Sequence, residues 1–325
     1  MARGRCPMNN QIFISILAPL MNDFVTFKKY HGYDYGGRAA MLWYFDRFLL
    51  RSGHDHHGIT TSILERYALS MRHLAPNTQY VRLSSVRVFA RWLRLLIPES
   101  ALVEDICVRR PSLPRSYLYS HEELASIIAC TRRTGGMRGA CLATLFGLLY
   151  ATGLRIGEAL ALNMGDIDLA GSRLTIRRGK LGKARNIVLC KSTAAALGRY
   201  LDERNAIPPG GPNAPVFSDK NGRRFNYDNV SKKFRSMLRK CGIGTGSACP
   251  PRLHALRHTF ACDCLCKWYR EGSDVNALLP ILATAMGHVS IGSTQIYLHV
   301  TSQLLITASG RFEPTFTRNT MGANQ

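Results

Sequence analysis

Residues 252–259 read Arg-Leu-His-Ala-Leu-Arg-His-Thr, a basic stretch whose apolar residues have the spacing of a helix start. His254 and Arg257 are three positions apart, so on a helix they share one face and can reach the same ligand. A guanidinium presents a fixed fork of donors that fits phosphate oxygens, and an imidazole can give or take a proton near neutral pH. For this octet alone, a solvated basic helix face is an equal alternative. The rest of the chain has to decide between the two interpretations.

The charge balance points to a polyanionic partner. The chain has 325 residues, which favours two domains, and its 46% hydrophobic and 20% charged residues are typical of a globular protein. Lys and Arg number 43 against 21 Asp and Glu, giving a net charge of +22. Such an excess makes nucleic acid the first partner to consider. A membrane surface fits the charge equally well, but the sequence contains no long lipid-seeking amphipathic helix.

The ten cysteines do not form a disulfide or zinc pattern, because no CxxC pair occurs. We interpret them as reduced and mostly buried thiols. An apolar run from Ile12 to Met21 has a weak likeness to a signal peptide, but Asn9, Asn10 and Gln11 precede it and no small-residue cleavage site follows. No run reaches the roughly 18 apolar residues that span a bilayer. A cytoplasmic location without membrane contact is expected.

The first part of the chain, residues 1–110, has the periodicity of an all-helical bundle of about four or five helices. One helix includes Leu17 to Phe27, a second runs from Ala39 to Leu50, and Thr60 or Thr61 caps a third that continues to Met71. Pro76 begins the fourth, and Pro98 ends it. The apolar side of the fourth helix is predicted to consist of Val81, Phe89, Trp92 and Leu96.

Three arginines of the fourth helix, Arg87, Arg91 and Arg94, stand on a different side from its apolar residues. They could be a solvated stripe. Given the net charge, we favour contact with DNA phosphates and predict these three as DNA-binding residues.

An extended basic linker, ending at Pro114, separates this bundle from a second domain over residues 115–325. Ser120-His121-Glu122-Glu123 is a capping box that opens a helix, and a long apolar helix from Met137 to Ala151 stops at Gly153. Two β-prone runs, 174–177 and 187–189, predict a hairpin, Val216 and Phe217 predict a further strand, and Asn226 caps a basic helix. The predicted fold class is mainly α with a small β-sheet (α+β).

Two basic positions in this second part have the chemistry of phosphate ligands. Arg155 begins a new helix, where unpaired backbone N–H groups favour an anion. Glu158, one turn on, either orients Arg155 through a salt bridge or compensates the helix dipole. Lys180 is predicted at the hairpin tip, where Lys183 and Arg185 compete with it for a role.

Four stretches in order resemble the conserved boxes of the tyrosine recombinases, a family that includes phage integrases, Xer-type resolvases and recombinases of mobile elements. They are Ala151–Glu158, His254–Thr259, Gly287-His288 and Gln295-Ile296-Tyr297. The resemblance covers about Leu118 to Val300, and on weaker grounds the first helices resemble the family's SAM-like core-binding domain. One departure is the segment Tyr269–Pro280, which lengthens the interval between the second and third boxes relative to compact members.

The resemblance implies a set of catalytic residues: Arg155, Lys180, His254, Arg257, His288 and Tyr297. The arginines would bind the scissile phosphate, and Tyr297 would attack it to give a 3′-phosphotyrosine. Arginines and imidazoles can stabilise the charge that develops on the phosphate without a metal, so no metal or cofactor is expected. The implied partner is double-stranded DNA with specific recombination sites. It would be bound by a homo-tetramer on synapsed duplexes, or by a tetramer shared with sister recombinases.

The predicted function is that of a site-specific DNA recombinase acting in integration, excision or transposition. Two alternatives stay open: a type IB topoisomerase, which uses similar chemistry without sequence-directed synapsis, and a catalytically silent DNA-binding protein of the same fold. A packed helix aromatic is the structural alternative for Tyr297.

Overall fold

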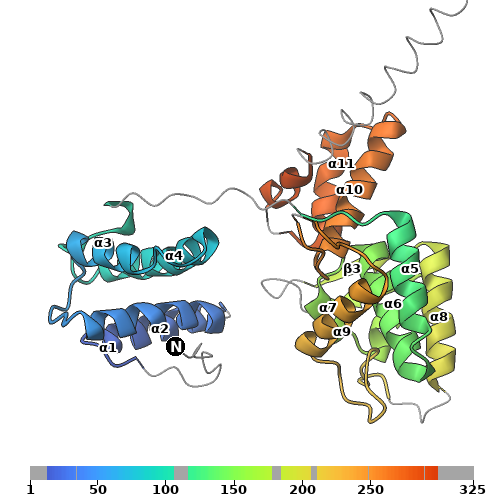
Figure 1. The fold of residues 1–325 in the computed structure, drawn as a ribbon, viewed down its shortest axis with the longest axis horizontal. Coiled ribbons are helices and arrows are strands. Elements are labelled where there is room, and N and C mark those ends of the chain that lie inside the picture. The colour runs from blue at the N-terminus through green and yellow to red at the C-terminus, as the bar shows by residue number, and fades with distance from the viewer. Residues whose placement is uncertain are drawn as a thin grey trace, which may run out of the picture. The chain divides into compact units, whose positions relative to one another are not determined.

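The structure is a computed structural model that describes residues 13–33, 35–105, 116–177, 184–205, 211–247, 249–288 and 290–298. The chain divides into two units, Met1–Pro114 and Arg115–Gln325, and each is described by itself (Figure 1). No helix within the described residues is both long and apolar enough to cross a membrane.

The first unit is helical throughout its described residues. It consists of α1 (Ala18–Tyr30), α2 (Gly36–Arg51), α3 (Thr61–Ser70), α4 (Pro76–Leu93) and a 3-10 turn, η1 (Val103–Asp105). The Thr60 hydroxyl accepts the Ile63 N–H at 3.3 Å and so caps α3, and Pro76 occupies the first turn of α4. Buried Asp46 on α2 accepts backbone N–H groups of Ile14 and Ser15, at 3.1 and 2.9 Å, which ties the segment before α1 to α2.

The core of this unit lies between the four helices, where Phe24, Phe45 and Phe89 are fully buried. The predicted apolar side of α4 is wrong at Leu96, which is 56% exposed. The helix ends at Leu93, so Leu96 does not continue its buried side. Phe89 is buried as predicted, and the other buried apolar residues of α4 are Leu83, Val86, Ala90 and Leu93.

The second unit is built around one central helix, α6 (Gly136–Thr152). Its helices are α5 (His121–Arg132), α6, α7 (Ile156–Ala161), α8 (Lys191–Asn205), α9 (Tyr227–Lys240), α10 (Ala255–Arg270) and α11 (Val275–Met286), with a 3-10 turn, η2 (Met164–Asp166). Helix α6 contacts α5, α8 and α10, which is why its residues are apolar on all sides (Figure 1). The capping box predicted at Ser120 and the cap predicted at Asn226 are both confirmed.

A small antiparallel sheet in the order β1-β2-β3 completes the unit. Its strands are β1 (Ile167–Asp168), β2 (Arg173–Ile176) and β3 (Arg185–Val188), and Leu174 pairs with Ile187 so that both side chains are buried. The predicted class, mainly α with a small sheet, is therefore confirmed.

The strand predicted at Val216 and Phe217 is wrong. Both residues are fully buried, but Val216 N–H donates to Leu162 O at 3.0 Å and Phe217 O accepts from Phe225 N–H at 3.3 Å without a continuous ladder. A short apolar run indicates that a segment is buried, but it does not show that the segment is a strand. The third strand is β1 instead.

The prediction of mostly buried thiols is also wrong. Of the described cysteines only Cys141 and Cys262 are buried, and Cys190 is exposed.

Candidate active site

Two arginines meet at the carboxyl end of α11. Arg257, in the first turn of α10 and 3% exposed, donates to Gly153 O at 2.6 Å and to Met286 O at 2.8 Å. Arg155, which precedes α7, donates to Gly287 O at 2.8 Å and to Met286 O at 3.4 Å. The carbonyl at position 286 therefore accepts from both guanidinium groups. A helix carboxyl end carries a partial negative charge and unpaired carbonyls, which suits two cations held side by side.

One buried carboxylate neutralises part of this charge. Glu158 accepts from Arg155 at 3.0 Å and from Arg185 at 3.1 and 2.8 Å. Burial pushes the pKa of the Glu158 carboxyl upward, but hydrogen bonds and charges of Arg185 and Arg155 outweigh it and hold the pKa below its usual value. Of the two alternatives for Glu158, the salt bridge that orients Arg155 is therefore present.

Arg185 lies inside the site and not at the hairpin tip. Its side chain is 10% exposed, and its Nε donates to Ala285 O at 3.1 Å. It therefore does not compete with Lys180 for the hairpin-tip role. Lys180 and Lys183 both lie outside the described residues, so the assignment of Lys180 stays a prediction.

Gly287 is required where α11 ends. It adopts φ +66°, and an added Cβ would lie 2.7 Å from Arg185 Nη1. The next residue, His288, donates its backbone N–H to Ala283 O at 2.8 Å, and its Nδ1 lies 2.7 Å from Thr294 Oγ1. The end of α11 therefore carries His288 directly after the two residues whose carbonyls hold the arginines.

Tyr297 lies beside two histidines, and a third contacts one of them. Its ring centroid is 5.4 Å from that of His258 and 6.3 Å from that of His288, with the His288 ring nearly parallel at 11°. The His254 ring lies 4.9 Å from His258 at 90°. Tyr297 is only 4% exposed and packs on apolar residues of α10 and α11, including Ala261. The structure thus brings together five of the six predicted catalytic residues: Arg155, His254, Arg257, His288 and Tyr297.

Burial and the arginine charges set the protonation of this cluster. Burial raises the pKa of Tyr297, although Arg257 and Arg155 act in the opposite direction. Burial, His254 and Arg257 lower the pKa of His258 to about 4, and burial lowers the pKa of Arg257 to about 10. Burial, Arg257 and Arg155 lower the pKa of His254. These shifts favour the neutral phenol of Tyr297 and the neutral rings of His254 and His258.

The predicted DNA-binding arginines are not brought together as a free stripe. Arg87 and Arg91 both pair with Glu104, at 3.2 and 2.5 Å, whereas Arg94 is exposed at the end of α4. Their contact with DNA stays a prediction.

The first unit contains a second basic group that was not predicted from the sequence, formed by Arg38, Arg47 and Arg82. The Arg82 guanidinium of α4 lies 3.7 Å above the Tyr44 ring of α2, and the Arg47 guanidinium lies 5.0 Å from the Trp43 ring. Arg38 donates to Ser85 at 3.5 Å. The helical spacing of Trp43 and Arg47 was the only sequence signal for this group.

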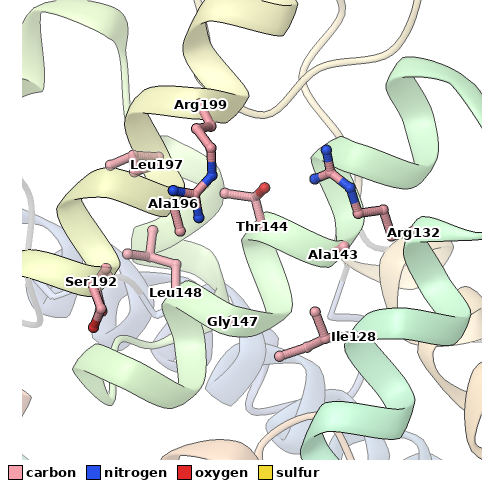
Figure 2. Close-up of a pocket in the computed structure, with 11 residues that line it drawn as sticks. Ile128, Arg132, Ala143, Thr144, Gly147, Leu148, Ser192, Ala196, Leu197 and Arg199 are labelled. Atoms are coloured by element: carbon pink, nitrogen blue, oxygen red, sulfur yellow. The ribbon is translucent and has the colours of Figure 1, made fainter.

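A hollow of about 290 Å³ lies elsewhere in the second unit, between α5, α6 and α8 (Figure 2). Ile128, Leu148 and Ala196 form part of its apolar lining, and Arg132 and Arg199 flank it. None of the described active-site residues lines this hollow. The candidate site is instead a cluster of side chains at the junction of α7, α10 and the end of α11.

Comparison with known proteins decides the family. Residues 118–303 match the model of the phage integrase family. The chain is 32% identical over 313 residues to y4rB of Sinorhizobium fredii, described as an integrase or recombinase, covering 92% of this chain and 98% of that protein. The chain belongs to the phage integrase family. It is also 32% identical to the tyrosine recombinase XerD of Caulobacter vibrioides, over 79% of this chain and 83% of that protein.

Solved structures of integrases share the fold. The Tn1549 transposon integrase in complex with transposon right end DNA matches with a TM-score of 0.66 at 16% identity, covering 91% of this chain and 99% of that one. The XerH site-specific recombinase bound to its palindromic difH substrate matches with a TM-score of 0.64 at 20% identity, covering 85% and 79%. Every predicted catalytic residue of this integrase-family chain falls inside the matched residues 118–303, so the expected family resemblance is confirmed.

Proposed function

We propose that this chain is a site-specific DNA recombinase that cleaves and rejoins strands through a 3′-phosphotyrosine at Tyr297. The observation that carries the proposal is the shared carbonyl of Met286, which holds Arg155 and Arg257 side by side in the unit that also contains the Tyr297–histidine cluster. Paired guanidiniums fit the non-bridging oxygens of a phosphodiester, where charge develops during attack. Membership of the phage integrase family supports the same chemistry.

The proposed reaction exchanges one ester bond for another. The Tyr297 oxygen forms a bond to phosphorus while the bond to the 5′ oxygen breaks, and the phenolic proton goes to a base. His254 is suited to accept that proton because burial and the neighbouring arginine charges lower its pKa and so favour the neutral ring. His288 would donate to a non-bridging oxygen, and Lys180 would give a proton to the departing 5′ oxygen. The phosphotyrosine keeps the bond energy, so rejoining needs no ATP.

Activation of the phenol is a specific demand of this site. A buried Tyr297 whose pKa lies above its ordinary value of 10.0 is a weak nucleophile at neutral pH. Arg257 and Arg155 oppose the effect of burial and so favour the phenolate in the transition state. We infer that substrate binding must complete the activation, which couples attack to correct placement of the phosphate.

The proposed partner is double-stranded DNA with specific recombination sites, and the net charge of +22 fits it. We propose residues 1–110 as a core-binding DNA-binding domain and 115–325 as the catalytic domain with its C-terminal tail. Two of the structural neighbours are DNA complexes of a transposon integrase and a Xer recombinase, which supports a DNA partner. Strand exchange between two duplexes would require a tetramer.

A covalent trapping experiment tests the function. The probe is DNA from the sequences flanking the gene, where element ends or repeats would lie, nicked so that a cut fragment diffuses away. It should accumulate a protein–DNA adduct on a denaturing gel. Tyr297→Phe should bind the same DNA and form no adduct, since only the hydroxyl is lost. Wild-type protein that binds the DNA without forming an adduct would be the silent DNA-binding protein. Relaxation of supercoiled plasmids lacking the element ends would favour the topoisomerase.

A further inference from the structure

Thr294 is a buried hydroxyl with a specific partner. The residue is fully buried, and its Oγ1 lies 2.7 Å from Nδ1 of His288. Thr294 is one helical turn before Tyr297, so both side chains are on the same side of the segment 292–298. A buried hydroxyl without a partner is costly, and here His288 supplies one.

His288 is held by its main chain and by one nitrogen of its ring. Its backbone N–H donates to Ala283 O at 2.8 Å, which fixes the main chain beyond α11. The remaining freedom is rotation of the side chain, and the contact with Thr294 limits it. Because Nδ1 is turned toward Thr294, Nε2 is the nitrogen on the opposite side of the ring.

The proton on this imidazole depends on its partner. A neutral imidazole has one N–H donor and one acceptor, and the hydrogen bond at one nitrogen selects the state of the other. When the Thr294 hydroxyl donates to Nδ1, Nε2 must carry the proton. When the ring is cationic, the hydroxyl accepts from Nδ1, and Nε2 again carries a proton. In the third arrangement a neutral ring donates its Nδ1–H to the Thr294 oxygen and leaves Nε2 bare. A bare Nε2 would turn a lone pair toward an anionic phosphate oxygen, so the repulsion disfavours this arrangement at a bound phosphate.

We propose that Thr294 is a positioning residue that makes Nε2 of His288 a hydrogen-bond donor to the phosphate attacked by Tyr297. The rings of His288 and Tyr297 lie nearly parallel with centroids 6.3 Å apart, so the imidazole and the nucleophile belong to one cluster. This inference rests on the proposed function, and it adds a residue that touches neither DNA nor the reacting atoms.

A pair of substitutions separates the hydroxyl from the shape of the side chain. Thr294→Val keeps the branched shape and removes the hydroxyl, and Thr294→Ser keeps the hydroxyl. On nicked DNA in single turnover, Thr294→Val should cut about 10–100-fold more slowly, by analogy with the loss of a partner that orients a metal-binding histidine. Thr294→Ser should recover most of the rate. The Kd for DNA should stay the same in both, because the effect lies in the chemical step.

A His288→Trp background tests whether Thr294 acts through the imidazole. Indole has a single N–H and no second tautomer, so a hydroxyl cannot select its donor. Thr294→Val should therefore cost no additional rate in His288→Trp. An equal loss in both backgrounds would mean that Thr294 only packs, and an unchanged rate in the otherwise wild-type protein would also overturn the proposal.

A measurement on the DNA-free protein separates this inference from the proposed function. Nitrogen-15 NMR of labelled histidine should find a proton on Nε2 of His288 in the wild type and a mixture of tautomers in Thr294→Val. A bare Nε2 in the wild type would overturn the role of Thr294 whatever the activity. If the wild-type protein forms no DNA adduct but shows the expected tautomer, the proposed function fails and the hydrogen-bond assignment stands.

Discussion

Arg185 donates two hydrogen bonds to Glu158, at 3.1 and 2.8 Å, from the first residue of β3. The same carboxylate accepts from Arg155, so one anion holds two guanidiniums, and Arg185 also reaches the end of α11 through Ala285 O. The sheet is thereby connected to the pair of arginines at the end of α11. Loss of this carboxylate should disturb stability and site geometry together.

Glu158→Gln should destabilise the protein by about 3–5 kcal/mol, because it leaves buried arginine charges uncompensated. Denaturant unfolding followed by circular dichroism measures the change. Glu203→Gln is the matched control: Glu203 also pairs with an arginine, Arg132, but the two side chains are 40% and 55% exposed. It should cost only about 0–1 kcal/mol. Equal costs for the two variants would contradict the bridging role of Glu158.

Stability should fall as the pH falls from about 6.5 toward about 4. The pKa of His258 is lowered from 6.5 to about 4 by burial and by the facing groups His254 and Arg257. In that interval His258 binds a proton in the unfolded chain but not in the folded chain, so acid favours unfolding. Solvent screening at this half-buried ring limits the effect to about 1 kcal/mol, or about 2–4 °C in Tm. Thermal unfolding measured across this pH range checks the prediction. The change of Tm with pH should be smaller in His258→Gln than in the wild type, and equal changes would contradict the role of His258.

Lys180 is predicted to protonate the departing 5′ oxygen. Lys180→Ala should therefore cleave ordinary DNA slowly and recover on DNA with sulfur in place of the bridging 5′ oxygen, since a thiolate leaves with little protonation. Arg155→Ala should stay slow on both substrates, because its proposed contact is with the non-bridging oxygens. Lys183→Ala is the neighbouring control. Rescue of Lys183→Ala in place of Lys180→Ala would move the general acid to Lys183.

The salt dependence of DNA binding tests Arg87, Arg91 and Arg94. Changing all three to Ala should lower the slope of log K against log salt by up to about three, at about 0.9 for each phosphate contact. Glu104→Gln should strengthen binding, since the carboxylate that pairs with Arg87 and Arg91 would no longer compete with phosphate. If the triple variant leaves the slope unchanged and Glu104→Gln leaves the affinity unchanged, Arg87, Arg91 and Arg94 are only solvated. A change on replacing Arg38, Arg47 and Arg82 would then assign DNA contact to the second basic group.

The sequence by itself determined the features that depend on local interactions. The caps at Thr60, Ser120 and Asn226 follow from side chains that satisfy N–H groups two or three residues away. Gly153 ends α6 because glycine readily adopts the positive φ needed there. The four ordered boxes indicated the family without any knowledge of the fold. Periodicity was less informative for Val216 and Phe217, because burial without a neighbouring strand gives the same pattern.

Only the tertiary structure decided which distant residues meet. Arg185 contacts Ala285, 100 positions away, and no local rule distinguishes such a buried arginine from a solvated one at a hairpin. The pairing of Arg87 with Glu104 and the contact of Thr294 with His288 likewise depend on how a turn brings two elements together. Helix caps and turns are set by interactions over a few residues, whereas a cationic site is set by which carbonyls and carboxylates the packed helices place around it.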